Sequence, residues 1–329
     1  MPTRSFLRTF SLSIFLLPLA AGAAPVRVTR TSAPPTRVQK ARSSTPGRTI
    51  ANGSYRPTTK VGRLVAAFRA KPRASVVTPR PGTSEGTYAD VANEKMFIDG
   101  VSVGDVDQGH LGDCYFVAAL ASVAYAQPKL LENAITERPD GSLSVRLYHR
   151  ASDGHYETDD VTVDKLVPVS GTGRPSFAHG QVAGQMWPAW IQKAYAAHSS
   201  LENGKGTYDQ IGKGGFPSSA FEALTGKPAR DLYVDPSLSS NLYAPIEQAL
   251  LGQHPVVAFT PQKLPEGAPV HESHTYSILG IRTVEGKQMI KVRNPWGYSE
   301  PGDPNGGDGI FELELAEFAK NFTTVTIGG

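Results

Sequence analysis

The stretch QGHLGDCYFVAALASVA, residues 108–124, holds the only cysteine of the 329-residue chain. From Gly112 to Ala126 the residues are small or apolar on every face of the helix that they predict, which is typical of a helix buried on all sides. Asp113 is of a type preferred at the N-cap, which sets Cys114 in the first turn. The helix dipole stabilises the thiolate form of a cysteine at this position, so the sequence predicts a reactive thiolate with a lowered pKa. The alternative is a cysteine that merely packs in the core.

The N-terminus predicts a secretory signal peptide over residues 1–23. Arg4 and Arg8 supply the positive charge, residues 10–20 form an apolar run, and residues 21–23 offer small side chains for cleavage. The apolar run is too short for a stable membrane anchor, and no later stretch predicts a transmembrane segment. We therefore expect a protein exported from a bacterial cell, to the periplasm or the exterior. A single cysteine forms no internal disulfide, so stability must come from an ordinary core.

Charge is distributed unevenly along the chain. Residues 24–85 contain 13 Lys or Arg and one acidic residue, whereas residues 86–329 contain 18 basic and 29 acidic residues, a net charge of 18 − 29 = −11. The first segment is also rich in Pro, Ser and Thr, so it predicts a disordered basic arm. No aromatic interleaving or binding module accompanies the charge, which argues against nucleic-acid binding. We interpret the arm as a pro-segment that docks on the acidic core; a tether to an anionic surface and a solvated linker are the alternatives.

A nucleophilic cysteine needs a base, a group that orients the base, and donors for an oxyanion. His274 begins and Asn294 ends a predicted β-hairpin that turns at residues 283–286, so pairing brings the two close together. An Asn oxygen that accepts from the imidazole fixes its tautomer. His271 is the rival base, but it precedes the strand. Gln108, six residues before Cys114, is the candidate side-chain donor for an oxyanion hole.

Helices dominate the first part of the ordered region and strands the second, which predicts an α+β chain of two lobes. We expect a helical lobe at about residues 86–212 that carries the cysteine. A β-rich lobe at about residues 213–329 then carries the histidine and asparagine.

Three blocks, QGHLGDCYFVAALAS, HTYSILG and VRNPWG, resemble the active-site blocks of the calpain-like cysteine protease core. The resemblance extends from about residue 89 to the C-terminus and follows the family's order. It implies a papain-like two-lobed fold and peptide-bond hydrolysis through an acyl-enzyme. It assigns the catalytic roles to Cys114, His274, Asn294 and Gln108.

The resemblance also implies two calcium ions. Gly100 and Asp105 match one site, in which Gln192 stands where a glutamate ligand is expected, and Glu300 and Asp308 match part of the other. Calcium is therefore expected, if at all, as a structural activator, with no cofactor for the chemistry itself. Two further departures are mild: Tyr115 replaces a common tryptophan and Ser273 a usual glycine.

The leading interpretation is an exported cysteine endopeptidase that acts on a protein or peptide substrate. An acyl transferase would use the same triad but pass the acyl group to an amine instead of water. The third possibility is an interaction module that has the fold of a protease but no activity. The presence of all four catalytic residues argues against it.

Overall fold

The computed structural model describes residues 80–198, 206–298 and 307–329. The chain divides into two compact units, Met1–Phe68 and Arg69–Gly329, and the first lies wholly outside the described residues. The predicted signal peptide and almost all of the predicted basic arm therefore lie outside them as well. In the described part, no helix is long and apolar enough to cross a membrane.

The first lobe is built around helix α2 (Cys114–Ala126), whose residues from Tyr115 to Ala124 are all buried. Its alanines let neighbouring helices approach closely, and the ring of Phe116 stacks on Tyr195 at a centroid distance of 4.1 Å. The predicted buried helix is thus confirmed. The surrounding helices are η1 (Val103–Asp105), α3 (Pro128–Glu132), α4 (Trp187–Ala197), α5 (Tyr208–Ile211) and α6 (Pro217–Thr225).

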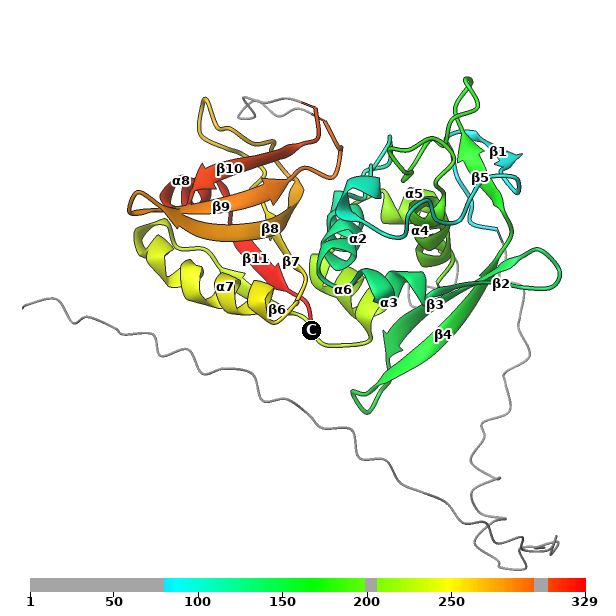
Figure 1. Ribbon diagram of the computed structural model, residues 1–329, viewed down its shortest axis with the longest axis horizontal. Helices are drawn as coiled ribbons and strands as arrows, with labels where there is room; N and C mark the ends of the chain where they lie inside the picture. The colour runs from blue at the N-terminus through cyan, green and yellow to red at the C-terminus, as the bar shows by residue number, and fades with distance from the viewer. Residues whose placement is uncertain (1–79, 199–205, 299–306) are drawn as a thin grey trace, which may run out of the picture. The chain divides into compact units, whose positions relative to one another are not determined.

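Two small antiparallel sheets flank these helices (Figure 1). In Leu143–Arg150 buried residues alternate with more exposed ones, and the partner strand buries its last three residues. The hairpin that the two strands form turns at the SDGH sequence that predicted it. The three-stranded sheet contains β2 (Ile135–Glu137), β3 (Leu143–Arg150) and β4 (Tyr156–Val163); the two-stranded sheet contains β1 (Thr87–Asp90) and β5 (Leu166–Val169).

The second lobe is a six-stranded antiparallel sheet in the order β10-β9-β8-β7-β11-β6. Its central hairpin turns at Glu285 and Gly286, which both have positive φ (50° and 81°), as a tight hairpin turn demands. The strands are β6 (Arg230–Tyr233), β7 (Val256–Phe259), β8 (Thr275–Val284), β9 (Lys287–Arg293), β10 (Ile310–Glu314) and β11 (Thr324–Ile327). The helices of this lobe are η3 (Pro236–Leu242), α7 (Tyr243–Leu251) and α8 (Leu315–Asn321), whose buried residues pack with the sheet.

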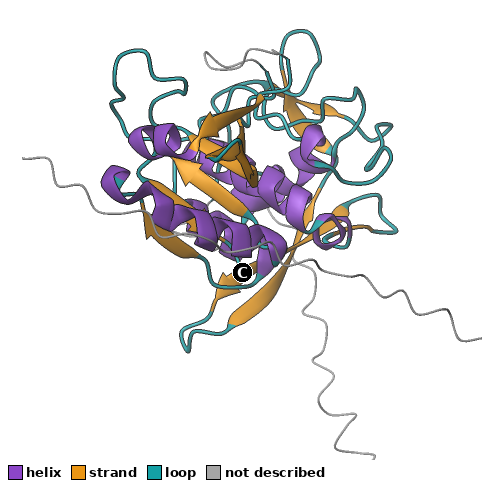
Figure 2. Ribbon diagram, turned by 60° about the vertical axis from the view of Figure 1, so that its left-hand side comes forward, coloured by secondary structure: helices purple, strands orange, loops and turns teal. Residues whose placement is uncertain are grey.

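The two lobes meet where α2 packs against β7 and β8 (Figure 1). Figure 2, turned by 60°, shows helices lying against the strands. Ser277 of β8 donates its hydroxyl to the Ala118 carbonyl at 2.8 Å, and Ser122 exchanges hydrogen bonds with the backbone of Val256 at 2.9 and 2.7 Å. Small hydroxyl side chains thus satisfy backbone groups at a close helix–sheet contact. The N-terminus of α2, with Cys114, is therefore held beside the start of β8.

The boundary between the lobes lies later than the sequence suggested. Ala220, Phe221 and Leu224 of α6 belong to the core of the first lobe, and the chain enters the second sheet only at β6. The expected division near residue 212 therefore moves to about Gly226, which ends α6 in the left-handed conformation. The Gly-rich break that suggested the earlier boundary is instead a loop between α5 and α6.

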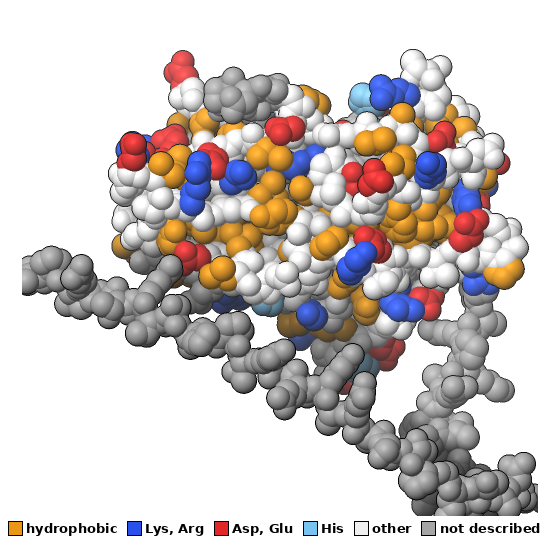
Figure 3. Space-filling model, in the orientation of Figure 1, with side chains coloured by type: hydrophobic (Ala, Val, Ile, Leu, Met, Phe, Trp, Pro, Cys, Tyr) orange, Lys and Arg blue, Asp and Glu red, His pale blue; other side chains and the backbone are white. Residues whose placement is uncertain are grey.

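The predicted arm also ends earlier than residue 85. Arg80 forms a 2.6 Å ion pair with Asp164, and the backbone N–H of Ser84 donates to Asp209 at 2.9 Å. Residues 80–85 therefore pack along the first lobe. On the face shown in Figure 3, Lys and Arg side chains are interspersed with Asp and Glu.

Candidate active site

Cys114 is the first residue of α2 and lies at the interface between the lobes. Intrahelical bonding begins with the N–H groups of Phe116 and Val117, which donate to the Asp113 carbonyl. The N–H of Cys114 precedes them and belongs to the orphan donors of a helix N-terminus. Its Sγ lies 3.9 Å from Oγ1 of Thr275, the residue that follows His274 in the opposite lobe. The predicted nucleophile therefore lies, across the interface, beside the residue that follows the predicted base.

The resting thiol differs from the expected thiolate. Burial raises the pKa of Cys114 above its ordinary value, hydrogen bonding from Thr275 opposes this, and the neighbouring Asp113 raises it further. Desolvation disfavours the charged form of the sulfur. The sequence could not predict this effect, because it depends on how the lobes pack. Cys114 therefore rests as a thiol and needs a base to activate it.

His274 and Asn294 form the predicted pair. His274 precedes β8, Asn294 follows β9, and Ser277 pairs with Arg293 in that hairpin. Nε2 of His274 lies 2.8 Å from Oδ1 of Asn294, and the Trp296 N–H donates to the same oxygen at 3.0 Å. Two donors on one atom fix the amide, so the imidazole carries its proton on Nε2 and leaves Nδ1 as the basic nitrogen.

The imidazole lies in an aromatic setting. The ring of Trp296 packs on His274 at a centroid distance of 4.6 Å, and Asn294 and His274 are both buried. Burial lowers the pKa of His274 to about 4, although the bond to Asn294 opposes the shift. His274 is therefore neutral at pH 7, the form that a general base requires.

Ser273, the residue before the histidine, has a left-handed φ of 49°. This conformation is costly for a residue with a side chain and free for glycine. Glycine, which is usual at this position in the family that the chain resembles, suits the backbone better. Serine retains the conformation, with its N–H bonded to the Pro261 carbonyl at 2.8 Å.

Gln108 is buried, and its backbone N–H donates to the Pro295 carbonyl across the lobe interface at 2.9 Å. Its Nε2 donates one hydrogen to the Leu111 carbonyl, which pins the amide inside the loop before α2. The second hydrogen of Nε2 is the one that an oxyanion could use. The buried Oε1 has no partner in the described part of the chain.

Asp113 carries an interaction that the sequence did not predict. It occupies the N-cap position, yet its side chain makes no capping bond. Instead Oδ2 accepts from Nε2 of Gln192 at 2.7 Å, while Oε1 of Gln192 accepts from the Ala178 N–H at 3.1 Å. The Ala178 N–H thus fixes the direction of the Gln192 amide. Burial raises the pKa of Asp113 to about 7, against the opposing bond from Gln192.

Asp113→Asn should stabilise the protein at alkaline pH. The folded chain keeps a proton on Asp113 between its ordinary pKa near 3.8 and about 7, where the unfolded chain has lost it. The neutral side chain is therefore favourable at low pH, and this contribution is lost as pH rises through 7. Asparagine mimics the neutral form at every pH. Its advantage in unfolding free energy should grow from pH 4 to pH 8 by on the order of a few kcal/mol.

Urea unfolding of both proteins at the two pH values measures this difference. Asp140→Asn, at a fully exposed carboxylate whose pKa is lowered by its bonds to Ser142, is the control and should show no such gain. An advantage of Asp113→Asn that does not change with pH would contradict the raised pKa.

The predicted calcium ligands are already engaged. Oδ2 of Asp105 accepts from the Ser102 N–H at 2.7 Å, and Oδ1 of Asp308 accepts from the Ile310 N–H at 2.9 Å. Gln192 bonds inward, as described above, and Glu300 lies outside the described residues.

The local charge also disfavours a cation. The guanidinium of Arg293, whose pKa is lowered by burial, interacts electrostatically with Asp107, Asp308 and Asp105. Within residues 80–198, 206–298 and 307–329, no group of three His, Cys, Asp or Glu residues could hold a metal ion. Gly100 has a φ of 91°, but no such group gathers around it. Because Glu300 lies outside the described residues and calcium also takes backbone carbonyl ligands, calcium binding stays a prediction.

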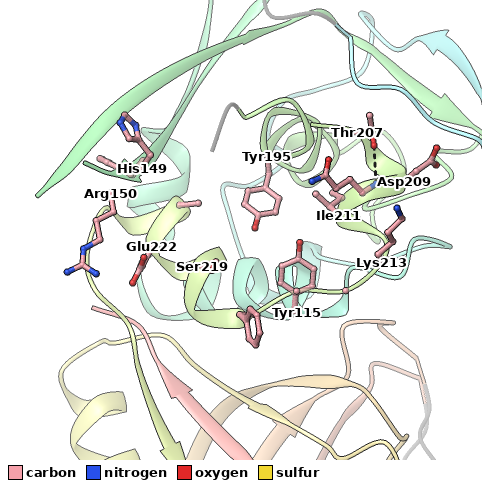
Figure 4. A pocket seen from close by; sticks show the side chains of 16 residues that line it. Tyr115, His149, Arg150, Tyr195, Thr207, Asp209, Ile211, Lys213, Ser219 and Glu222 are labelled. Carbon is pink, nitrogen blue, oxygen red and sulfur yellow. Dashed lines mark hydrogen bonds between the residues drawn. The ribbon is translucent and has the colours of Figure 1, made fainter. Parts of the chain in front are cut away.

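A cavity of about 1050 Å³ lies in the first lobe next to the nucleophile helix. Figure 4 shows Tyr115 and Tyr195 pointing into it, with Glu222 from α6 and Lys213 from the loop before α6 at its walls. None of the three predicted triad residues lines it. Its lining mixes apolar rings with both signs of charge.

Comparison with known proteins assigns the family. The family model described as calpain family cysteine protease matches residues 80–304, more than half of the chain. Human calpain-9 is 28% identical over 243 residues, which cover 71% of this chain and 33% of that protein. The calpain-1 catalytic subunit of Macaca fascicularis is 31% identical over 64% of this chain and 30% of its own length. The calpain-type cysteine protease DEK1 of Zea mays is 30% identical over 61% of this chain and 9% of its own length.

Two solved structures are also similar. PepW from Lactobacillus rhamnosis HN001 has 10% identity, covers 84% of this chain and 92% of its own, and gives a TM-score of 0.29. A structure from work on the mite allergens Blo t 1 and Der p 1 has 14% identity, covers 77% and 74%, and gives 0.28. TM-scores this low do not support any inference about this chain.

The chain spans about a third or less of the length of the three calpain relatives named above. The family match extends over both lobes and includes all four sequence-predicted catalytic positions. The chain belongs to the calpain family of cysteine proteases.

Proposed function

We propose that this protein is an exported cysteine endopeptidase that hydrolyses peptide bonds through Cys114, His274 and Asn294. The observation that carries the proposal is the buried 2.8 Å bond between His274 and Asn294, held opposite the first residue of α2 by the contact of Cys114 with Thr275. A nucleophile, a neutral base and a group that orients the base are the three parts that acyl-enzyme chemistry requires.

In the first half-reaction, Nδ1 of His274 takes the thiol proton as the sulfur attacks the peptide carbonyl. The negative oxygen that forms accepts hydrogen bonds from the Cys114 N–H and the second hydrogen of Gln108 Nε2. The imidazolium, held by Asn294, then gives its proton to the leaving nitrogen as the C–N bond breaks. This leaves a thioester on Cys114 and releases the amine product.

In the second half-reaction, His274 takes a proton from water, whose oxygen attacks the thioester. Collapse of the intermediate breaks the C–S bond, releases the carboxylic acid and returns the proton to the sulfur. Burial raises the Cys114 pKa and lowers the His274 pKa, so the neutral pair is the resting state. Proton transfer therefore accompanies attack, as general-base catalysis requires.

We further propose that the signal peptide directs the protein to the periplasm or the exterior, and that the basic arm docks on the catalytic core. Support for docking comes from the residues that directly follow the arm, because Arg80 pairs with Asp164 of the first lobe at 2.6 Å. Exposed charge pairs weaken in salt, since the Debye length falls from about 10 Å at 0.1 M to about 3 Å at 1 M. Calcium dependence stays a prediction, and no step above uses the ion.

The test is hydrolysis of an unfolded protein substrate by the purified chain, followed by mass spectrometry of the products. We expect a new carboxyl end and a new amino end at each cleaved bond, which together have gained one water, even when a primary amine is added in excess. Products that carry the amine would show an acyl transferase, and an unchanged substrate would show a module without turnover. Parallel assays with a chelator and at high salt test the calcium and arm predictions.

A further inference from the structure

A buried ion pair joins the two lobes directly beside the catalytic residues. Nη2 of Arg293, the last residue of β9, lies 3.2 Å from Oδ1 of Asp107 in the first lobe. The Arg293 side chain is 1% exposed and that of Asp107 is 15% exposed. Asp107 immediately precedes Gln108, and Arg293 immediately precedes Asn294. Each end of the pair is thus one residue from a proposed catalytic group.

Both ends are fixed by further contacts. The backbone of Asp107 exchanges hydrogen bonds of 3.0 and 2.9 Å with His179. Gln181 donates Nε2 to Oδ1 of Asp107 at 3.3 Å and to the Gly297 carbonyl at 3.4 Å, so it also bridges the lobes. A Cβ on Gly297 would lie 1.8 Å from the same carboxylate oxygen, and its φ is 73°. Only glycine permits the turn after Asn294 to approach Asp107 this closely.

The neighbouring backbone shows what the ion pair controls. The Gln108 N–H donates to Pro295 at 2.9 Å, and the Trp296 N–H fixes the Asn294 oxygen at 3.0 Å. A shift of Arg293 against Asp107 would move the Gln108 loop relative to Asn294, and with Asn294 the imidazole of His274. A buried charge pair is costly in stability and is better explained by the geometry that it specifies.

We propose that Asp107 and Arg293 are positioning residues, which hold the Cys114–Gln108 side of the site in register with the His274–Asn294 side across the lobe interface. The proposal rests on the proposed function, because the register matters only if Cys114 and His274 react together. The guanidinium also faces the carboxylates of Asp105 and Asp308. It thus supplies a fixed positive charge at this point of the interface.

The test measures the alkylation rate of Cys114 by iodoacetamide at one neutral pH, which requires no proteolysis. The proteins are the wild type and the variants Arg293→Gln, His274→Ala and the double variant. Arg282→Gln is the matched control, because Arg282 lies in the same hairpin and forms a 2.7 Å pair with Glu312 on the surface of one lobe. Asp107→Asn is the second variant if Arg293→Gln does not fold, as judged by circular dichroism.

We expect Arg293→Gln to slow alkylation to the rate of His274→Ala, and the double variant to be no slower than either. Such non-additivity shows that Arg293 acts through His274. For hydrolysis we expect kcat to fall about 100-fold, the scale of an ångström-sized misplacement, with a smaller change in KM. Arg282→Gln should behave as the wild type.

Three outcomes would overturn the proposal. If Arg293→Gln folds and its Cys114 is still alkylated faster than that of the double variant that also lacks His274, the ion pair has only a structural role and the proposed function stands. If adding calcium restores the variant's alkylation and isothermal titration shows that the wild type binds the ion, calcium rather than the guanidinium sets the register. If His274→Ala leaves wild-type alkylation unchanged, the proposed Cys114–His274 chemistry fails together with the positioning role.

Discussion

Cys114→Ala is expected to reduce hydrolysis about a million-fold while the protein stays folded. The chain has no other cysteine, so the variant has no thiol. Losing the nucleophile of a covalent mechanism costs about as much as losing the whole triad. Alanine is a good helix former, and the removed sulfur is only partly buried, so α2 should persist.

The measurement is the initial rate of peptide release, with circular dichroism and urea unfolding as checks on the fold. Thr83→Ala, at an exposed hydroxyl that bonds only its own turn, is the control and should retain full activity. Residual hydrolysis by Cys114→Ala within about tenfold of the wild type would refute the assignment of the nucleophile.

Alkylation of the same cysteine tests the resting protonation state. Burial raises the pKa of Cys114 and lowers that of His274, so the wild-type rate should keep rising above the ordinary thiol range near pH 9. The helix dipole alone would give a plateau at lower pH, as the sequence suggested. A plateau below pH 7 would show a preformed thiolate–imidazolium pair.

Local patterns in the sequence were sufficient to predict much of the candidate active site. The turn at Glu285 and Gly286 fixes the hairpin, and the hairpin brings His274 and Asn294 to 2.8 Å. The small and apolar residues of α2 predicted a helix buried on all sides, with Cys114 in its first turn. Each of these features depends on residues that are close along the chain or paired by one turn.

The features that escaped prediction depend on residues far apart in sequence. Asp113 suits an N-cap, yet its side chain turns to Gln192, 79 residues away, because burial demands a donor. Arg293 meets Asp107 across 186 residues. The pKa of Cys114 changes in the opposite direction to the expected one because the lobes desolvate it. For Asp113 and Cys114, burial in the folded chain overrides a local preference that the sequence had indicated.

His274→Ala should cost nearly as much as loss of the cysteine, with a fall in kcat/KM of about 10⁵-fold or more. Without this imidazole the proposed mechanism has no base for the thiol proton, and the raised pKa of the sulfur makes spontaneous ionisation rare at pH 7. Triad members act as a unit, so the loss should not add to that of Cys114→Ala. The assay is the same peptide release, with the fold checked by circular dichroism.

His271→Ala is the matched control, because His271 is the other histidine of the segment that leads into β8. Its ring packs on Trp296 at 4.4 Å and lies 6.3 Å from that of His274, whereas the 2.8 Å bond to Asn294 belongs to His274. Removing it exposes one side of Trp296 and should lower activity by less than about tenfold, the effect of a packing change beside an intact triad. If His271→Ala proves inactivating and His274→Ala mild, then the base has been assigned to the wrong histidine, and the bond to Asn294 serves only to hold the hairpin.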